Sequence, residues 1–375
     1  MMSPTLRAAG AAILLAALPG ALAAQSTLYP SASAVTGVEV RQYGFDSKFG
    51  LDHIRQIAVP FAVAVPIGRR FSFDIGTWYA STTVASDAGD ETFSSLTDTQ
   101  LRLAYTFGAD AVVASVVVNL PTGKETTTQE QFGVAAGTSS NFLLFPVNTY
   151  GAGTSVTPGL AAAATLGQWN VGIAASVRWS AEYEPFNDGA DPDLKYQPGV
   201  EARVRLGLDR LIGNSRFSLG GTFSTFANDE LNGSGTNASS TYEPGNRFLV
   251  DANLTSPMGS GTVSVYAWDY HRVTSGNSDG VIGTKENILA GGVSGNFPLS
   301  SRTAFEPMVE ARFWMPKTGK GSLFGAGAGL RVQLSPAIAF VPSARVDVGS
   351  IRVADSGPSS SVFGWDVSGM LRYTF

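Results

Sequence analysis

The stretch that decides the fold is FGWDVSGMLRYTF, residues 363–375. Its odd-numbered positions hold apolar or small residues, with aromatic rings near both ends, whereas Asp366 and Arg372 occupy even-numbered positions. Successive side chains of a β-strand point to opposite faces, so the segment predicts a strand with one apolar and one charged face. An apolar face bordered by aromatic residues, with charges on the other face, is typical of transmembrane β-barrels.

The same segregation recurs in residues 170–182, 198–209 and 305–315, where charged side chains share one parity and bulky apolar side chains share the other. A cationic side chain turned to mid-bilayer lipid costs ~2–4 kcal/mol, so a lipid-facing wall requires this separation. Residues 263–271 are ambiguous because neither parity is purely apolar. There we expect Tyr266, Trp268 and Tyr270 to face outward.

Connections of two lengths alternate along the chain. Seven short turns and eight long loops imply about sixteen antiparallel strands, with about fourteen as the alternative, and an even number is usual for bacterial outer-membrane barrels. Both ends of the barrel domain then lie at the short-turn rim. We therefore predict an all-β, antiparallel up-and-down transmembrane barrel. The short turns are expected near Gly68, Gly108, Gly167, Gly213, Gly259, Ser300 and Ser335, and the long loops near Ser47, Ala88, Thr128, Asp188, Ser234, Asn277, Lys317 and Ser356.

Composition narrows the class of protein. Charged residues make up 15% of the 375, and there are 43 glycines and no cysteine. Aromatic residues at 10% and a net charge of only −5 do not fit a disordered chain or a strongly basic nucleic-acid binder. Without cysteine the fold has no disulfide and no thiolate metal site. We expect no cofactor, no metal and no nucleic-acid partner.

The first residues predict a secretory signal peptide. Arg7 precedes an apolar stretch, residues 8–18, which Pro19 and Gly20 end. The stretch is shorter than the ~20 residues that span a bilayer, and the following Ala-Leu-Ala fits a cleavage site. We expect residues 1–23 to be the signal peptide and residues 24–375 to form a single barrel domain.

Strand parity predicts a set of charged side chains that face the barrel lumen. These residues carry both signs of charge, which leaves two interpretations open. They form either a ladder of ion pairs that stiffens the wall or a constriction that selects solutes by charge. The predicted pore-lining residues are Arg102, Arg178, Glu182, Glu201, Arg203, Arg205, Glu306, Glu310, Arg312, Arg331, Arg345, Asp347, Asp366 and Arg372.

The two histidines are candidates for catalytic or metal-binding groups. Asp52 precedes His53, and Asp269 lies two residues before His271 on the same strand face. Such a pair can polarise water at a barrel rim, but no serine nucleophile or carboxylate pair is placed beside either histidine. Two histidines without cysteine are also too few for a metal site. We assign no catalytic residue and expect both histidines to be solvated.

The long loop after residue 120 contains the run Phe142-Leu143-Leu144-Phe145. Consecutive apolar residues are unusual in an exposed loop. The run either folds into the lumen and gates the pore, or lines an entry site for apolar solutes, or merely extends a strand or forms the core of a compact loop. We expect these four residues to contact an apolar solute in or over the pore.

Three features together carry a family resemblance. They are the strand of small and β-branched residues 111–120 that runs into Pro-Thr-Gly, the loop with residues 142–146 and the Tyr-Gly-Ala-Gly of residues 150–153, and the terminal aromatic strand. The chain resembles outer-membrane transport barrels associated with the degradation of phenol and other aromatic compounds, which are distant relatives of the long-chain fatty-acid transport barrels. The ending with Tyr373 and Phe375 resembles the signal that the barrel assembly machinery reads.

The resemblance implies passive passage of small hydrophobic or aromatic compounds across the outer membrane of a Gram-negative bacterium. The expected partners are small-molecule solutes, outer-membrane lipid and lipopolysaccharide, and the barrel assembly machinery; the sequence gives no oligomeric state. One alternative is a barrel that does not transport, serving as a structural protein or a hydrolase at the rim. A periplasmic all-β binding protein is another alternative, against which the terminal aromatic strand argues.

Overall fold

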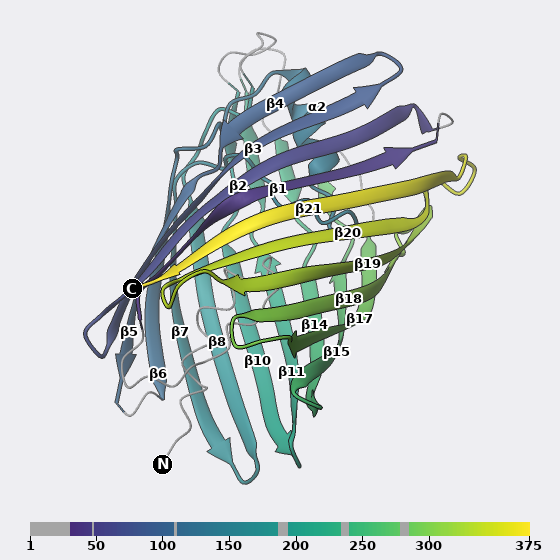
Figure 1. The fold of residues 1–375 in the computed structure, drawn as a ribbon. Helices are drawn as coiled ribbons and strands as arrows, with labels where there is room; N and C mark the ends of the chain where they lie inside the picture. The colour runs from purple at the N-terminus through teal and green to yellow at the C-terminus, as the bar shows by residue number, and fades with distance from the viewer. Residues whose placement is uncertain (1–30, 47–48, 109–110, 187–193, 234–239, 278–284) are drawn as a thin grey trace.

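The computed structural model describes residues 31–46, 49–108, 111–186, 194–233, 240–277 and 285–375. The signal peptide predicted for residues 1–23 lies outside this part of the chain. Nearly all of the described chain is β-sheet, and strands that follow one another along the chain lie side by side and antiparallel (Figure 1). Among the described residues, no helix is long and apolar enough to cross a membrane.

The main sheet closes on itself. β1 (Ser33–Phe45) pairs with both β2 (Leu51–Ile67) and β21 (Ser360–Thr374). β3 (Phe71–Ser86) pairs at one end with β4 (Gly89–Leu96) and at the other with β5 (Thr99–Phe107), so β4 and β5 are two parts of one barrel strand. The sheet is thus a closed antiparallel barrel of sixteen strands, which confirms the predicted fold and the larger of the two predicted strand numbers.

The remaining barrel strands follow in chain order around the wall. They are β6 (Val112–Leu120), β7 (Ser155–Leu166), β8 (Trp169–Ser180), β10 (Glu201–Ile212), β11 (Ser215–Phe226), β14 (Arg247–Met258), β15 (Gly261–Arg272), β17 (Glu286–Pro298), β18 (Thr303–Trp314), β19 (Lys320–Gln333) and β20 (Ile338–Arg352).

The predicted short turns are confirmed, but not all of the predicted long loops are long. The seven predicted short turns all join neighbouring strands, and at Gly167 and Gly213 the backbone has φ of +63° and +60°, which glycine adopts without steric cost. Only five residues separate β1 from β2 and β18 from β19, where long loops were expected near Ser47 and Lys317. The long loop expected near Ala88 is also wrong. β3 and β4 pair as far as Ser86 and Gly89, so only a tight turn separates them.

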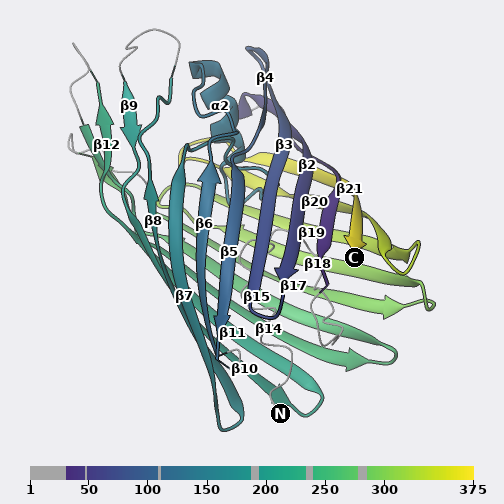
Figure 2. The same ribbon diagram turned by 90° about the vertical axis from the view of Figure 1, so that its left-hand side faces the viewer.

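The two ends of the barrel meet at the short-turn rim. The backbone N–H of Ala32 donates to the Phe375 carbonyl at 3.0 Å, and the N–H of Phe375 donates to the Ala32 carbonyl at 2.9 Å. At the opposite rim, three long loops contribute the short strands of a separate four-stranded sheet. These strands are β9 (Lys195–Gln197), β12 (Asp229–Asn232), β13 (Ser240–Glu243) and β16 (Gly276–Asn277), and Figure 2 shows β9 and β12 extending beyond the barrel wall.

One expectation about facing is wrong, that for the aromatic residues of β15. The register places Trp268 opposite the inward-facing Asp251, and the hydroxyl of Tyr266 donates to Glu310 Oε2 at 2.9 Å. Tyr266, Trp268 and Tyr270 therefore face the lumen, whereas Asp269 and His271 lie on the outer face. Both parities of this strand mix polar and apolar groups, so only its pairing with β14 settles which face is inside.

Candidate functional site in the barrel lumen

The lumen holds a long segment between β6 and β7, residues 121–154, which we call the inner loop. It contains the helix α2 (Gln129–Thr138), at whose start the Thr128 side chain and Gln131 form a capping box. α2 packs near β3 and β4, where Val134 is buried with Ala58 and Ala80. The inner loop thus turns back onto the wall instead of projecting into solvent.

Asp98, in the gap between β4 and β5, holds both ends of the inner loop. Its Oδ1 accepts from the Gly123 N–H at 3.1 Å and its Oδ2 from the Ala152 N–H at 2.8 Å. The two ends pass so close together that a Cβ on Gly123 would lie 2.1 Å from the Tyr150 carbonyl. Only glycine fits such an approach. The Pro-Thr-Gly and Tyr-Gly-Ala-Gly sequences therefore form the base of the inner loop.

A buried glutamine of β2 fixes the middle of the inner loop. The Gln56 side chain donates from Nε2 to the Val147 carbonyl at 2.7 Å and accepts the Val147 N–H at its Oε1 at 2.8 Å. Gln56 and Val147 are almost inaccessible to solvent. This amide pair replaces the backbone hydrogen bonds that an irregular segment lacks, so the segment can lie buried against the wall.

Two arginines donate hydrogen bonds to backbone carbonyls of the apolar run. Arg312 of β18 donates to the Phe142 carbonyl, and Arg41 of β1 donates to the Leu144 carbonyl. Leu144 has φ of +53°, a conformation that is uncommon for a residue with a side chain and persists where surrounding contacts enforce it. The inner loop therefore leaves β6 and reaches strands on the other side of the barrel.

The four residues of the apolar run differ in exposure. Phe142, Leu143 and Phe145 are at most 5% exposed, whereas Leu144 is 36% exposed. The Phe142 ring stacks on Trp314 with centroids 6.0 Å apart, and Phe145 meets Tyr43 edge to face at 5.6 Å. Three of the four side chains thus fill the space between the inner loop and the wall, and Leu144 alone keeps substantial accessible surface.

We call the lumenal faces of β17 to β21, β1 and β2 the covered wall, because the inner loop packs on them. Its charges form a buried network. Arg345 lies 3.0 Å from Glu310 and 2.7 Å from Asp347, and the three side chains are 14, 7 and 4% exposed. Arg312, 2% exposed, bonds Glu310 at 2.5 Å. In β1 and β21, Arg41 pairs with Glu39 at 3.0 Å and with Asp366 at 3.2 Å.

We call the lumenal faces of β7, β8, β10, β11 and β14 the open wall. Here Arg178 and Arg203 pair with Glu201, at 3.4 and 2.6 Å, and Arg205 pairs with Asp251 at 2.8 Å. The arginine side chains are 40, 43 and 32% exposed, and only Glu201 is buried. The charges of this wall are therefore in contact with solvent, in contrast to those of the covered wall.

The other predicted pore-lining residues lie near the ends of the strands. Arg102 pairs with Asp74 across β3 and β5 at 3.6 Å. Towards the short-turn rim, Arg331 pairs with Glu306 at 2.7 Å, and Arg372 lies beside both. Glu182 is not on a barrel strand, because β8 ends at Ser180.

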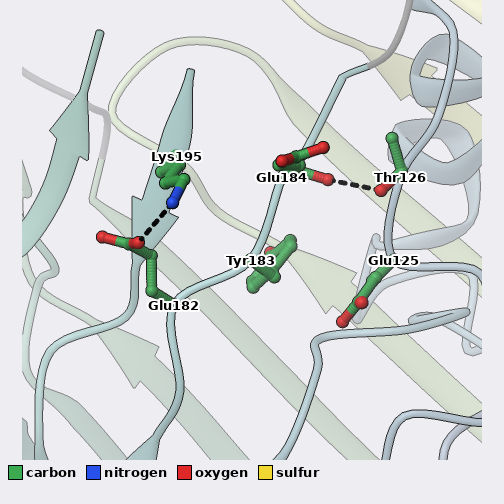
Figure 3. Close-up of a pocket in the computed structure, with 6 residues that line it drawn as sticks. All are labelled: Glu125, Thr126, Glu182, Tyr183, Glu184 and Lys195. Carbon is green, nitrogen blue, oxygen red and sulfur yellow. Dashed lines mark hydrogen bonds and ion pairs between the residues drawn. The ribbon is translucent and has the colours of Figure 1, made fainter. Parts of the chain in front are cut away.

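Glu182 instead lines a recess of about 240 Å³ at the long-loop rim, together with Glu125, Thr126, Tyr183, Glu184 and Lys195 (Figure 3). Lys195 lies 3.5 Å from Glu182. Burial and the carboxylates of Asp98 and Glu184 raise the pKa of Glu125. Burial and the nearby acids, Asp229 foremost, raise the pKa of Tyr183 to about 12. The surroundings of Glu125 and Tyr183 therefore favour the protonated form of these two side chains.

Neither histidine lies in the lumen. His53 Nδ1 is 3.1 Å from Asp52 Oδ2, but the Asp52 side chain is 78% exposed at the end of β2. On the outer face, Asp269 accepts a hydrogen bond from Asn287 at 2.8 Å, and the centroid of the His271 ring lies 6.4 Å from that of Phe248. Among the described residues, no group of three or more His, Cys, Asp or Glu is arranged to hold a metal ion.

The sequence pattern did not predict several residues that line the lumen. Glu39, Arg41 and Tyr43 share one parity of β1, a signal obscured by the polar Gln42 on the other face. Arg247 and Arg272 stand at strand ends, where parity is hard to read. No local sequence pattern indicates the role of Gln56 and Asp98, because that role depends on a loop that is distant in sequence.

Comparison with known proteins identifies no family: no family model matches this chain, and no curated protein matches its sequence. Solved structures that resemble it include OprB of Pseudomonas putida, 8% identical over 91% of this chain and 94% of that one, with a TM-score of 0.49. The CymD monoaromatic hydrocarbon channel is 10% identical over 93 and 89%, with a TM-score of 0.46. OmpT of Vibrio cholerae is 10% identical over 94 and 100%, with a TM-score of 0.41. The fold described above rests on this chain's own strand register, not on these likenesses.

Proposed function

We propose that the chain is a passive channel for small molecules in the outer membrane of a Gram-negative bacterium. The outer face of the barrel supports a membrane location. Outward side chains such as Leu206, Val346 and Phe363 are apolar and 49 to 56% exposed, and lipid is the environment that stabilises them. The charged side chains of the same strands face inward, where a water-filled lumen solvates them.

The observation that carries the proposal is the unequal filling of the lumen. The inner loop packs on the covered wall and leaves the arginines of the open wall 32 to 43% exposed. Residues on the open wall between these charges are small, including Gly159 and Ala161 of β7 and Ala174 of β8. A barrel closed throughout by side chains would bury them. The path for a solute therefore runs between the inner loop and the open wall.

The solutes that we propose are small apolar or aromatic compounds. Besides the family resemblance, the support is the strip of Tyr266, Trp268 and Tyr270, which lies on the lumenal face between the covered and open walls. A contact between two aromatic rings stabilises a complex by about 0.5–1.5 kcal/mol more than the burial of their surface alone. Contacts of this strength give brief residence, which suits passive passage. The proposal includes no enzymatic activity.

Conductance of the purified protein in planar bilayers tests the channel. We expect discrete steps of ion current, together with faster swelling of liposomes in phenol than in a sugar. A folded protein that passes neither ions nor solutes would support the non-transporting structural barrel instead. Swelling that depends on solute size alone would contradict the aromatic preference but not the channel.

We also propose that the barrel assembly machinery recognises Tyr373 and Phe375. Their rings stack 5.2 Å apart on the outer face and are 44 and 56% exposed. Changing Phe375 to Ser keeps the backbone pairing with Ala32 but removes the ring. We expect less of the compact, heat-modifiable form in cells, while refolding in detergent stays normal. Unchanged levels in cells would contradict this proposal.

A further inference from the structure

A row of arginines crosses the lumenal face towards the long-loop rim. In the strand register, Arg203 of β10 lies opposite Ser224 of β11, and Ser224 lies opposite Arg247 of β14. Arg247 in turn lies opposite Arg272 of β15. Neighbouring strands are ~4.8 Å apart, so the row spans only about four strands of the wall.

Arg247 and Arg272 carry like charges and face each other directly in register. Some lumenal arginines face a carboxylate in register, as Arg41 faces Asp366 and Arg178 faces Glu201, and Arg272 itself faces Glu286 on its other side. Directly opposite side chains in an antiparallel pair have Cβ atoms about 4.5–5.5 Å apart, and like charges there are destabilising. A chain that places two guanidinium groups so close needs a negative charge between or beside them.

The carboxylates of the protein do not fully supply that charge. Arg272 lies 3.6 Å from Glu286, and Arg203 lies 2.6 Å from Glu201. Both acids are largely buried, at 12 and 5% exposure, whereas the arginines are 36 and 43% exposed. Among the described residues, no carboxylate pairs with Arg247. The surface that the row presents to the lumen is therefore positive.

Aromatic rings lie next to this positive surface. The Arg247 guanidinium lies over the ring of Phe226, 4.6 Å from its centroid. Tyr270 lies beside Arg247 and Arg272, and its hydroxyl contacts Asn141 of the inner loop. The row thus faces the space between the inner loop and the open wall, which is the path proposed above for solutes.

We propose that Arg247 and Arg272, with Arg203 beside them, form an anion-selecting site for small aromatic carboxylates. This inference rests on the proposed channel function and adds the charge of the solute. A carboxylate can bridge the two guanidinium groups through charge-assisted hydrogen bonds, while the attached ring packs near Tyr270 and Phe226. Because the arginines are partly solvated, the site holds its ligand briefly and lets it pass on.

The experiment compares the full-length wild type with the double variant Arg247→Gln, Arg272→Gln in planar bilayers. Reversal potentials in a KCl gradient give the chloride-to-potassium permeability ratio, and benzoate against chloride gives the relative benzoate permeability. We expect an anion-selective wild type, and a loss of about threefold or more in both ratios in the double variant. Liposome swelling in benzyl alcohol, the neutral analogue, should not change.

Arg210→Gln is the matched control, because Arg210 lies on the outer face of β10 over the Trp169 ring, and this change should leave both ratios at wild-type values. The double variant removes both facing cations and with them their mutual repulsion, and heat-modifiable migration checks that it folds. If the double variant does not fold, Arg247→Gln alone replaces it.

Two failures are distinguishable. A folded protein that conducts but prefers potassium, or a folded variant that keeps the wild-type ratios, overturns the anion site and leaves the channel standing. A folded wild type that conducts nothing overturns the channel, and the anion site with it.

Discussion

The covered wall and the open wall are made of the same residue types on the same barrel, yet their charges occupy different environments. Arg312 of the covered wall is 2% exposed and Arg203 of the open wall is 43% exposed, although each bonds a glutamate two residues before it in its own strand. The difference comes from the inner loop, which excludes water from one wall and not from the other. Strand parity alone therefore says which way a charge points, but not whether it is solvated.

This contrast bears on the two interpretations of the lumenal charges. The network around Arg345 has the burial expected of an ion-pair ladder that stiffens the wall. The arginines of the open wall have the exposure expected of groups that act on solutes. We therefore propose that the charges of the covered wall stiffen the barrel and that those of the open wall act on solutes. The following changes test this assignment.

The largest effect is expected from removing a buried arginine. Arg312→Ala leaves Glu310 with one fewer cationic partner and removes a donor to the Phe142 carbonyl, so we expect a loss of about 3–5 kcal/mol in the free energy of unfolding. The matched change on the open wall, Arg203→Ala, should cost under about 1 kcal/mol. Urea unfolding in lipid vesicles measures both. Equal costs would mean that the two walls do not differ in solvation.

The next effect distinguishes the two faces of one strand. Val204 lies on the outer face of β10, beside the inward-facing Arg203. Val204→Arg should destabilise the barrel by about 2–4 kcal/mol if the position is near mid-bilayer, because lipid does not solvate the guanidinium group. The same vesicle assay measures it, with Val204→Leu as the control. A cost no greater than that of Arg203→Ala would contradict the assignment of faces.

Removing the apolar side chains of the inner loop should change the conductance of the channel more than its stability. Replacing residues 142–145 by Gly-Ser-Gly-Ser removes the side chains that pack on the covered wall while all sixteen strands keep their pairing. We expect single-channel conductance to rise by about twofold as the lumen widens. The same replacement of residues 353–356, in the loop between β20 and β21, is the control. Wild-type conductance in a folded variant would show that the inner loop does not constrict the pore.

The smallest effect concerns pH at the recess. Burial and two neighbouring carboxylates raise the pKa of Glu125, so the folded state favours its neutral form. That contribution to stability is full below the ordinary pKa of a glutamate and is lost as the pH rises through the raised value. The free energy of unfolding of the wild type should therefore fall slightly, within ~0.5 kcal/mol, as the pH rises from acid to neutral. Glu125→Gln should not show this fall, because glutamine does not titrate.

Thermal unfolding of wild type and variant at several pH values measures this change. Glu230→Gln, in β12 of the four-stranded sheet at the long-loop rim, is the control. An identical pH dependence of wild type and Glu125→Gln would rule out the contribution.

The sequence by itself determined the barrel. A strand has only two faces, so charge on one parity and bulk on the other fixes the facing of β10 and β21, and short turns with glycine fix the hairpins. It also identified the apolar run of residues 142–145 as a segment that needs cover. It failed where both parities are mixed, as in β15, whose facing depends on the register with β14.

The tertiary structure alone decided which charges are buried. Asp98, Gln56, Arg41 and Arg312 bind backbone groups of the inner loop, and none of these contacts is implied by local pattern because the partners are 25 to 170 residues apart. The row of Arg203, Arg247 and Arg272 likewise exists only in the register of four strands. Parity is a property of the backbone within one strand, whereas solvation depends on what the rest of the chain places in front of it.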